Sequence, residues 1–364
     1  MKLNRVREKI SREGLDGFLF SSQPSVFYLS QFSSTHAYVL LTAEGKRVLI
    51  TDGRYILKAG KILTPLGWEV REVTSPLFEK LTQIITDYGI KKLGVEGDRL
   101  RLDFFEKFKC KVGEKGITVI PYVGFLDQFR MVKTPEEIEK ISEAVEITER
   151  GFLSLVEFLK ENRKSLKGLT EKDLRSFLIC RYLKEGAQGE SFPTIVASGE
   201  NSAIPHHETS NTPLKEDSLL LIDTGVVWEG YCSDFTRTLF VGKPDRELIK
   251  VYDIVAQAHL EALQAVKVGR PLKEVDLAAR EYIASKGYGE FFTHSTGHGV
   301  GIEIHEPPRV YKSEDTLMVE GMVFTIEPGI YLPNKGGVRL ENIVVVTKEG
   351  ARVLQKTSLE PIEI

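Results

Sequence analysis

Two aspartates in the second half of the chain occupy positions that disfavour acidic residues unless a cation is bound. Asp223 ends the apolar run Leu219-Leu220-Leu221-Ile222, and Asp234 lies in the strand-like segment after the turn Glu229-Gly230. With the turn centred between Trp228 and Glu229, counting places Asp223 opposite Asp234 on one face of a hairpin. Like charges opposite each other destabilise a sheet, and burying both costs on the order of several kcal/mol. A cation between them removes the conflict.

A second pair of acidic residues repeats this pattern. Glu327 follows the apolar run 323–326, and Glu341 ends the returning strand after the turn Pro333-Asn334-Lys335-Gly336. A loop centred on Asn334 places Glu327 opposite Glu341. One such residue alone is most simply a surface acid on a loop. Four carboxylates on two hairpins form an oxygen-rich cage suited to divalent metals such as Mn²⁺, Co²⁺ or Zn²⁺.

Histidines gather in the same part of the chain. Five of the seven histidines fall into two clusters, which contain His206, His207, His294, His298 and His305. Glycines at 297, 299 and 301 surround His298, and glycine permits the close backbone approach that an imidazole ligand of a metal requires. The histidine clusters therefore strengthen the prediction of a metal site.

These segments resemble the pita-bread metallopeptidases, specifically the prolidase and aminopeptidase P branch. The resemblance rests on residues 223–225, 230–238, 297–301, 305–306, 325–329 and 339–341, which occur in order and at fitting spacings. It implies a mixed α/β and α+β fold: a creatinase/prolidase-type α/β domain at the N-terminus, then a pita-bread domain of two pseudo-twofold αβ halves. It also implies a homodimer.

The resemblance assigns the metal ligands position by position. Asp223 is then a ligand of one metal, Asp234 and Glu341 bridge both, and His298 with Glu327 binds the other. Two divalent ions per chain are the implied cofactor, with Mn²⁺ first and Co²⁺ or Zn²⁺ as alternatives. The chain has Asn342 where the family often has Asp, which leaves the ligands intact because that side chain is not one of them.

The expected reaction is hydrolysis of the bond before a proline, by a hydroxide that bridges the two metals. Glu327 is expected to take the proton from the water and pass it to the leaving nitrogen. By the same resemblance, His305 and His206 steady the developing oxyanion and the leaving group, and His294 lines the substrate side. A dedicated site is chemically reasonable because the bond before proline has no N–H.

The substrates are small peptides with proline at the second position, and two activities stay open. A dipeptidase must bind the carboxylate of the proline, and Arg309 resembles the arginine with this task in some prolidases. Arg339 also lies near the metals but is shared by aminopeptidase P relatives. The stretch 305–309 and the short N-terminal domain favour a Xaa-Pro dipeptidase over a Xaa-Pro aminopeptidase acting on longer peptides.

Three other classes are less favoured. A methionine aminopeptidase shares the five ligands but generally lacks the first 128 residues. A non-catalytic peptide-binding relative usually loses ligands, and none is missing here. The complete ligand set also disfavours a metal-free, creatinase-type hydrolase.

The elements that must position these residues begin at a strong helix start. Thr134-Pro135-Glu136-Glu137 combines a capping hydroxyl, proline at the first helical position and Glu three residues after the cap. We therefore predict domains at 1–128 and 129–364. In the second domain, helices near Thr170 and over 247–286 each precede an acidic hairpin, so two similar halves set the hairpins side by side.

The first domain carries no catalytic constellation and alternates short strands with helices. It starts with an amphipathic helix bearing Leu3, Val6 and Ile10, followed by a strand at 18–20 and a hairpin over 38–51. Further strands are expected at 69–73, 93–96 and 117–121.

Bulk composition excludes several partners. The 49 basic and 52 acidic residues are spread along the chain, which disfavours nucleic acid and anionic lipid as partners. No apolar run is long enough to span a membrane. Three widely spaced cysteines fit neither a disulfide framework nor a CxxC zinc site. A cytoplasmic location is the expectation.

Overall fold

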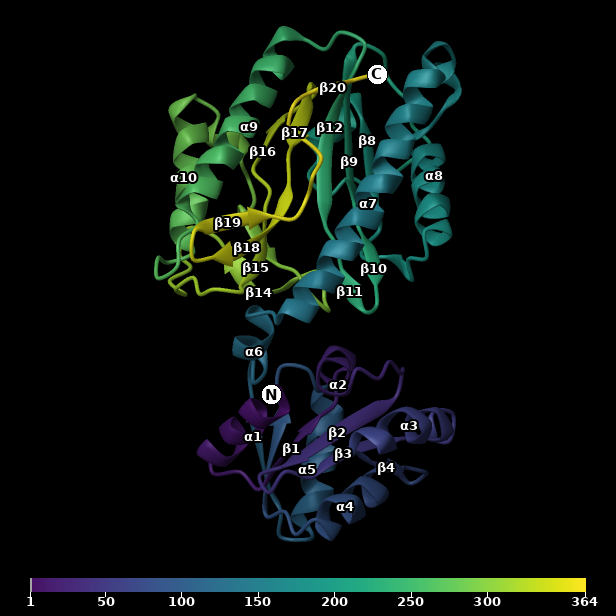
Figure 1. Ribbon diagram of the computed structural model, residues 1–364, viewed down its shortest axis with the longest axis vertical. Coiled ribbons are helices and arrows are strands. Elements are labelled where there is room, and N and C mark those ends of the chain that lie inside the picture. The colour runs from purple at the N-terminus through teal and green to yellow at the C-terminus, as the bar shows by residue number, and fades with distance from the viewer. Residues whose placement is uncertain (1) are drawn as a thin grey trace. The chain divides into compact units, whose positions relative to one another are not determined.

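The computed structural model describes residues 2–364 and divides the chain into two compact units. One unit ends at Phe129, and the other spans Arg130–Ile364 (Figure 1). The short helix α6 (Asp127–Met131) carries the chain from one to the other. Within the described residues, no helix combines the length and the apolar character that crossing a bilayer requires.

The N-terminal unit is a six-stranded sheet with helices in the connections. Its strand order is β4-β3-β2-β1-β5-β6, with β1 paired antiparallel to β2 and parallel to β5. The strands are β1 (Gly17–Phe20), β2 (Ala37–Thr42), β3 (Arg47–Thr51), β4 (Glu69–Glu72), β5 (Lys92–Glu96) and β6 (Thr118–Tyr122). The helices are α1 (Lys2–Arg12), α2 (Gln23–Ser30), α3 (Ile56–Leu63), α4 (Leu77–Asp87) and α5 (Leu102–Gly113), with the 3₁₀ turn η1 (Thr64–Leu66). The strands and the β2–β3 hairpin predicted from the sequence are confirmed.

Two pairs of helices flank the strands of the C-terminal unit. Figure 1 shows α7 with α8 on one side and α9 with α10 on the other. Their bounds are α7 (Pro135–Glu161), α8 (Glu171–Lys184), α9 (Arg246–Ala265) and α10 (Lys273–Ser285), and η2 (Arg163–Gly168), η3 (Gly199–Ala203) and η4 (Gly289–Phe291) are 3₁₀ turns. The predicted capping box is present at α7, where the Thr134 side chain accepts from the Glu137 N–H and the Glu137 carboxylate accepts from the Thr134 N–H. Thr170 and Asp173 form the same box at α8.

Each half of this unit has its own core beside its own hairpin. One core draws on α7, α8 and the strands up to residue 241, and includes Phe152, Leu174 and Phe235. The other draws mainly on α9, α10 and the strands from residue 310 onward, and includes Val255 and Phe324. The weak repeat in the sequence therefore corresponds to two successive αβ halves.

A four-stranded sheet, β20-β12-β9-β8, combines strands of the first half with the C-terminal strand β20, and the first half also forms a three-stranded sheet, β11-β10-β7. The second half contributes a five-stranded sheet, β14-β13-β15-β18-β19, and the pair β16-β17. Bounds in the first half are β7 (Gly189–Glu190), β8 (Ile195–Ser198), β9 (Ser218–Thr224), β10 (Val226–Trp228), β11 (Tyr231–Cys232) and β12 (Phe235–Val241). Those that follow are β13 (Gly297–Gly299), β14 (Glu306–Val310), β15 (Val323–Ile326), β16 (Gly329–Leu332), β17 (Gly336–Arg339), β18 (Asn342–Thr347), β19 (Gly350–Val353) and β20 (Ile362–Glu363).

The register of the first acidic hairpin differs from the prediction by two residues. Asp223 pairs with Thr236, not with Asp234. The reason lies in the turn, where Glu229 and Gly230 both have positive φ (45° and 79°), so Trp228 pairs with Tyr231 around a two-residue turn. Because side chains alternate with period two, a shift of two keeps both aspartates on the same face.

The register of the second acidic hairpin is as predicted. Leu332 pairs with Gly336 around a loop centred on Asn334, and Ile326 pairs with Asn342 farther from the loop. Glu327 and Glu341 stand between these pairs at the same register. Both acidic hairpins therefore present their carboxylates as matched or diagonal neighbours.

Candidate metal centre

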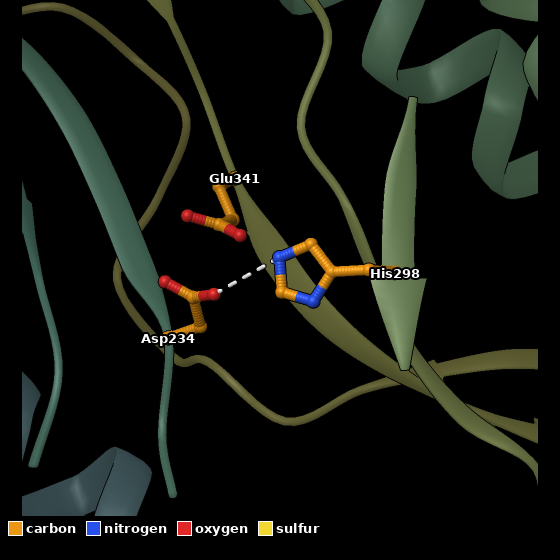
Figure 2. A group of neighbouring side chains, drawn as sticks. All are labelled: Asp234, His298 and Glu341. Carbon is orange, nitrogen blue, oxygen red and sulfur yellow. Dashed lines mark ion pairs between the residues drawn. The ribbon is translucent and has the colours of Figure 1, made fainter. Parts of the chain in front are cut away.

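Three side chains, one on strand β13 and two directly beside other strands, converge on one point. Asp234, His298 and Glu341 each offer a ligand atom, and these atoms lie within 4.8 Å of one another. Figure 2 shows the two carboxylates and the imidazole pointing toward one another. His298 Nε2 lies 3.4 Å from Asp234 Oδ2 and 3.3 Å from Glu327 Oε1. Because His298 Nδ1 is 3.2 Å from the Gly299 carbonyl and donates to it, Nε2 is left as the metal-binding nitrogen.

Two carboxylate oxygens beside this point lack the hydrogen bonds that buried oxygens normally have. Asp223 Oδ1 and Glu341 Oε1 are buried and find no donor anywhere in residues 2–364. Their sister oxygens are satisfied, since Asp223 Oδ2 accepts from Arg339 Nη2 at 2.5 Å and Glu341 Oε2 accepts from Thr236 Oγ1 at 2.7 Å. A buried oxygen with no donor is costly, and a divalent cation is the partner that carboxylates in such a cluster prefer. The residues present therefore fit a metal site.

The electrostatics of the cluster point the same way. Burial, followed by the charges of neighbouring carboxylates, raises the pKa of Asp234 and of Glu341 well above their ordinary values. Burial also raises the pKa of Glu327 to about 8, although Arg339 opposes this shift. For His298, burial lowers the pKa to about 4, so its ring is neutral at pH 7. The cluster therefore combines a neutral imidazole with carboxylates that repel one another, and a bound cation would relieve this repulsion.

We expect the carboxyl groups of the cluster to destabilise the metal-free protein as the pH rises from about 5 to 8, whereas the buried histidines, whose pKa values are lowered, act in the opposite direction below about pH 6.5. Asp234, Glu327 and Glu341 have higher pKa values folded than unfolded, so the folded state holds protons that the unfolded chain releases across this interval. Mn²⁺ replaces those protons, so its stabilising effect should grow with pH. Calorimetric melting with and without Mn²⁺, at about pH 5.5 and about pH 8, should show the larger increase in melting temperature at the higher pH. Equal increases would contradict this account.

All ten residues singled out in the sequence line one cavity of about 1160 Å³. Besides the five predicted ligands, its walls carry His206, His294, His305, Arg309 and Arg339. The His305 ring lies 4.3 Å from the His298 ring, between centroids. Arg309 on β14 pairs directly with His298 on β13, which places both side chains on the same face. Arg309 is exposed, and its guanidinium forms no hydrogen bond or ion pair with any residue that the structure describes.

A tyrosine that the sequence did not indicate links two of these residues. The Tyr331 hydroxyl accepts from Arg339 Nη1 at 2.9 Å and donates to His294 Nε2 at 2.7 Å. His294 Nδ1 in turn donates to the Ser295 carbonyl at 2.8 Å. Burial, together with the nearby Arg339 charge, lowers the pKa of His294 to about 4 and keeps its ring neutral. Arg339 is thus held between the Asp223 carboxylate and Tyr331.

Two threonines that orient the carboxylates were also missed. Thr236 donates to Glu341, and Thr325 Oγ1 donates to Glu327 Oε1 at 3.1 Å and accepts from the His298 N–H at 3.1 Å. Both threonines could have been found from the alternation of side chains along a strand, which places residues two apart on the same face. Thr236 stands two residues after Asp234, and Thr325 stands two residues before Glu327. The signal for Tyr331 is weaker, because its two partners come from separate segments.

Comparison with known families establishes where the chain belongs. Residues 139–348 match metallopeptidase family M24, and residues 2–132 match the creatinase/prolidase N-terminal domain. The chain belongs to family M24. As an M24 metallopeptidase it is a metal-dependent hydrolase whose cofactors are divalent metal ions. The resemblance noted in the sequence is confirmed, as is the fold that it implied, a creatinase-type domain followed by a pita-bread domain.

Relatives that match this M24 chain over nearly its whole length include proteins named as Xaa-Pro dipeptidases and proteins named as Xaa-Pro aminopeptidases. A solved structure named Xaa-Pro dipeptidase from Bacillus anthracis is 36% identical, covers 100% of this chain and 99% of its own, and has a TM-score of 0.93. A Thermotoga maritima structure named X-Pro aminopeptidase is 37% identical, with 99% and 100% covered and a TM-score of 0.89. A Pyrococcus horikoshii protein named Xaa-Pro dipeptidase is 35% identical, with 99% of this chain and 98% of that protein covered.

Proposed function

We propose that this M24 metallopeptidase is a Xaa-Pro dipeptidase, which hydrolyses the bond before the proline of a dipeptide. The observation that carries the proposal is the cavity in which Arg309, unpaired and exposed, stands beside His298 and the carboxylate cluster. A free guanidinium there is placed to bind a carboxylate at the far end of a short substrate. The names of the Bacillus anthracis and Pyrococcus horikoshii relatives support the same activity.

Asp223, Asp234, His298, Glu327 and Glu341 would hold two divalent ions, of which Mn²⁺ is the first candidate and Co²⁺ or Zn²⁺ the alternatives. Such a pair, when bound, supplies a water of lowered pKa and polarises the scissile carbonyl. The carboxylate-rich donor set with one imidazole suits these borderline metals. Arg339 neutralises part of the carboxylate charge and fixes Asp223 through their hydrogen bond.

The remaining steps belong to side chains of the cavity. Glu327 takes a proton from the attacking water and delivers it to the proline nitrogen, and Thr325 holds its carboxylate in place. Burial, with His206 nearby, lowers the pKa of His305, so this ring is neutral at pH 7 and donates an N–H to the developing oxyanion. His206, exposed in the cavity wall, contacts the leaving side. His294 is fixed by Tyr331 and lines the substrate path.

The test of this proposal compares a dipeptide with a tripeptide. Protein stripped of metal with a chelator should hydrolyse neither Ala-Pro nor Ala-Pro-Ala, and added Mn²⁺ should restore cleavage of Ala-Pro with the higher kcat/KM. If the restored enzyme prefers Ala-Pro-Ala, the activity is that of a Xaa-Pro aminopeptidase, the name of the Thermotoga maritima relative. If Mn²⁺, Co²⁺ and Zn²⁺ all fail to restore cleavage, the peptidase assignment itself fails.

Replacing Arg309 should separate the two substrates. Arg309→Ala removes a charge-assisted contact and should lower kcat/KM for Ala-Pro by about ten- to a hundredfold, equivalent to about 1.5–3 kcal/mol. Arg309→Lys should lie between, because an ammonium replaces two parallel hydrogen bonds with one point contact. Ala-Pro-Ala has no carboxylate at that place, so its hydrolysis should change little.

Lys348→Ala is the matched control, since Lys348 is an exposed cation outside the cavity. A variant at Arg309 that handles both peptides as the wild type does would show that this arginine does not bind the substrate carboxylate.

We further propose a homodimer that works in the cytoplasm. The homodimer rests on the family resemblance, and sedimentation should give about twice the chain mass of 41.0 kDa. The location is supported by free thiols at Cys110 and Cys180, both exposed, which suit a reducing compartment.

A further inference from the structure

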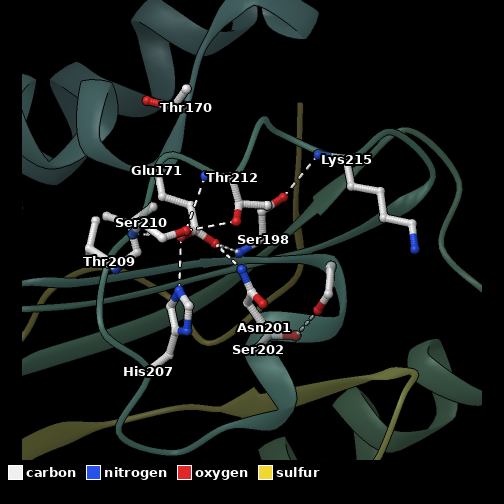
Figure 3. A network of polar contacts seen from close by, with 12 residues as sticks. Thr170, Glu171, Ser198, Asn201, Ser202, His207, Thr209, Ser210, Thr212 and Lys215 are labelled. Atoms are coloured by element: carbon white, nitrogen blue, oxygen red, sulfur yellow. Dashed lines mark hydrogen bonds and ion pairs between the residues drawn. The ribbon is translucent and has the colours of Figure 1, made fainter.

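The first residue of α8 has a fully buried carboxylate, which accepts hydrogen bonds from several residues of one loop. Glu171 is 0% exposed and accepts five hydrogen bonds, all from the loop formed by residues 198–210 (Figure 3). Its Oε1 accepts from the Ser198 N–H at 2.9 Å and from Asn201 Nδ2 at 2.8 Å. Its Oε2 accepts from His207 Nε2 at 2.8 Å and from Ser210 N–H and Oγ at 2.9 and 2.8 Å. These contacts reach both ends and the middle of the loop.

The same loop carries His206, which has no anchor of its own. Its ring is exposed in the cavity wall and forms no hydrogen bond with any residue from 2 to 364. Its two neighbours are held instead: the Pro205 carbonyl accepts from Arg339 Nη1 at 3.4 Å, and the His207 ring donates to Glu171. The position of His206 therefore depends on these two flanking contacts.

Glu171 is suited to hold the loop because it stays charged. Burial by itself raises the pKa of this carboxyl, but hydrogen bonds from Asn201, His207 and the Ser198 and Ser210 amides outweigh burial and lower it. An ionised carboxylate only accepts hydrogen bonds, so His207 Nε2 carries a proton. The N-terminus of α8 also favours a negative charge at this position.

The second half of the unit uses a similar arrangement. Asp276 on α10 is 0% exposed and accepts from the Thr296 N–H at 3.0 Å and from Thr296 Oγ1 at 2.8 Å. It also accepts from Arg280, which donates to the His294 carbonyl at 2.8 Å. In each half, a buried acid on the second helix fixes the loop that carries cavity histidines.

We propose that Glu171 and His207 are positioning residues for the peptidase reaction, fixing the loop 198–210 so that His206 reaches the substrate. This inference rests on the proposed function for the role of His206. Neither residue is among the five predicted metal ligands or hydrogen-bonded to one of them. Their effect should therefore appear in turnover and leave metal binding intact.

The kinetic test combines single variants at Glu171, His207 and His206 with one double variant, assayed with Ala-Pro and saturating Mn²⁺. Glu171→Gln leaves a single acceptor oxygen for five donors and should lower kcat by about ten- to a hundredfold, the scale of a small misplacement at an active site. His207→Ala should lower kcat by about tenfold, and His207→Gln should restore most of it because its amide presents an N–H in place of Nε2. KM and the Mn²⁺-induced rise in melting temperature should change little.

The double variant Glu171→Gln with His206→Ala identifies the residue through which Glu171 acts. If it acts through His206, the double variant should be no slower than His206→Ala alone. If Glu171→Gln reduces kcat by the same factor in both backgrounds, the positioning role toward His206 is overturned. Glu200→Gln is the matched control, since Glu200 lies in the same loop but pairs with Lys215 in solvent at 2.9 Å.

Hydrogen exchange tests the same inference without any substrate. Peptides covering 198–210 should exchange faster in Glu171→Gln and His207→Ala, return toward wild type in His207→Gln, and leave peptides covering 223–234 unchanged. Unchanged exchange over 198–210 overturns the inference even in an active enzyme. A wild type that fails to cleave Ala-Pro counts against the proposed function, while the exchange result still decides whether Glu171 fixes the loop.

Discussion

Asp234→Ala should abolish peptidase activity and strongly weaken metal binding, whereas His206→Ala should leave a measurable rate. Asp234 offers an oxygen within 4.8 Å of ligand atoms from both His298 and Glu341, so its loss opens the centre of the cluster. Removing one group that stabilises a transition state costs on the order of a hundredfold, which is the loss expected for His206→Ala. Removing the metal-dependent chemistry should reduce the rate by more than about 10⁴-fold.

Metal analysis provides the measurement that is independent of activity. Wild type loaded with excess Mn²⁺ and freed of weakly bound ions should approach two ions per chain, and Asp234→Ala should retain fewer than one. Asp253→Ala is a suitable control because Asp253 is an exposed aspartate on α9, away from the cavity. Mild and equal losses of activity in Asp234→Ala and His206→Ala would show that Asp234 is not a shared ligand.

The sequence predicted the elements best where local chemistry decides them. The capping box at Thr134 fixed the start of α7, and the loop centred on Asn334 fixed the register of the second acidic hairpin. The first hairpin was off by two residues because Glu229 adopts a positive φ beside Gly230, and a glutamate gives little warning of that conformation. The prediction that both aspartates lie on the same face of the hairpin still holds, because a register error of two residues leaves each side chain on its original face.

The candidate site was predictable because its chemistry requires unusual residues in unusual places. Acidic residues that follow apolar runs and histidines between glycines are recognisable in the sequence alone. The structure places all ten candidate site residues in the wall of one cavity. The assignment of each ligand to a particular metal stays a prediction. Supporting residues did not stand out, because their roles come from contacts between distant segments. In the sequence, Glu171 looks like an ordinary acidic residue in the first turn of a helix. In the structure, its carboxylate accepts hydrogen bonds from residues up to 39 positions away.

Glu327→Gln should reduce kcat by about 10²- to 10⁴-fold, the contribution expected of a general base, while part of the metal stays bound. The amide oxygen keeps the hydrogen bond from Thr325 and can still coordinate a cation, but it cannot accept the proton of water. Proline release from Ala-Pro measures turnover, and the rise in melting temperature with Mn²⁺ measures metal binding in the same samples. Glu320→Gln is the control, as Glu320 is exposed and 4.0 Å from its nearest cation, Lys348.

The pH profile separates the two roles of Glu327. In wild type, activity should fall at low pH for two reasons: protons displace the metals, and protonated Glu327 cannot act as a base. The fall caused by loss of metal should move to lower pH when the Mn²⁺ concentration is raised tenfold. The fall caused by protonation of Glu327 should not move. In Glu327→Gln, only the fall in activity that depends on the Mn²⁺ concentration should remain, because the residual rate no longer depends on the protonation of that side chain. A variant that keeps a fall in activity insensitive to Mn²⁺, or keeps wild-type turnover, would assign the proton transfer to another group in the cavity.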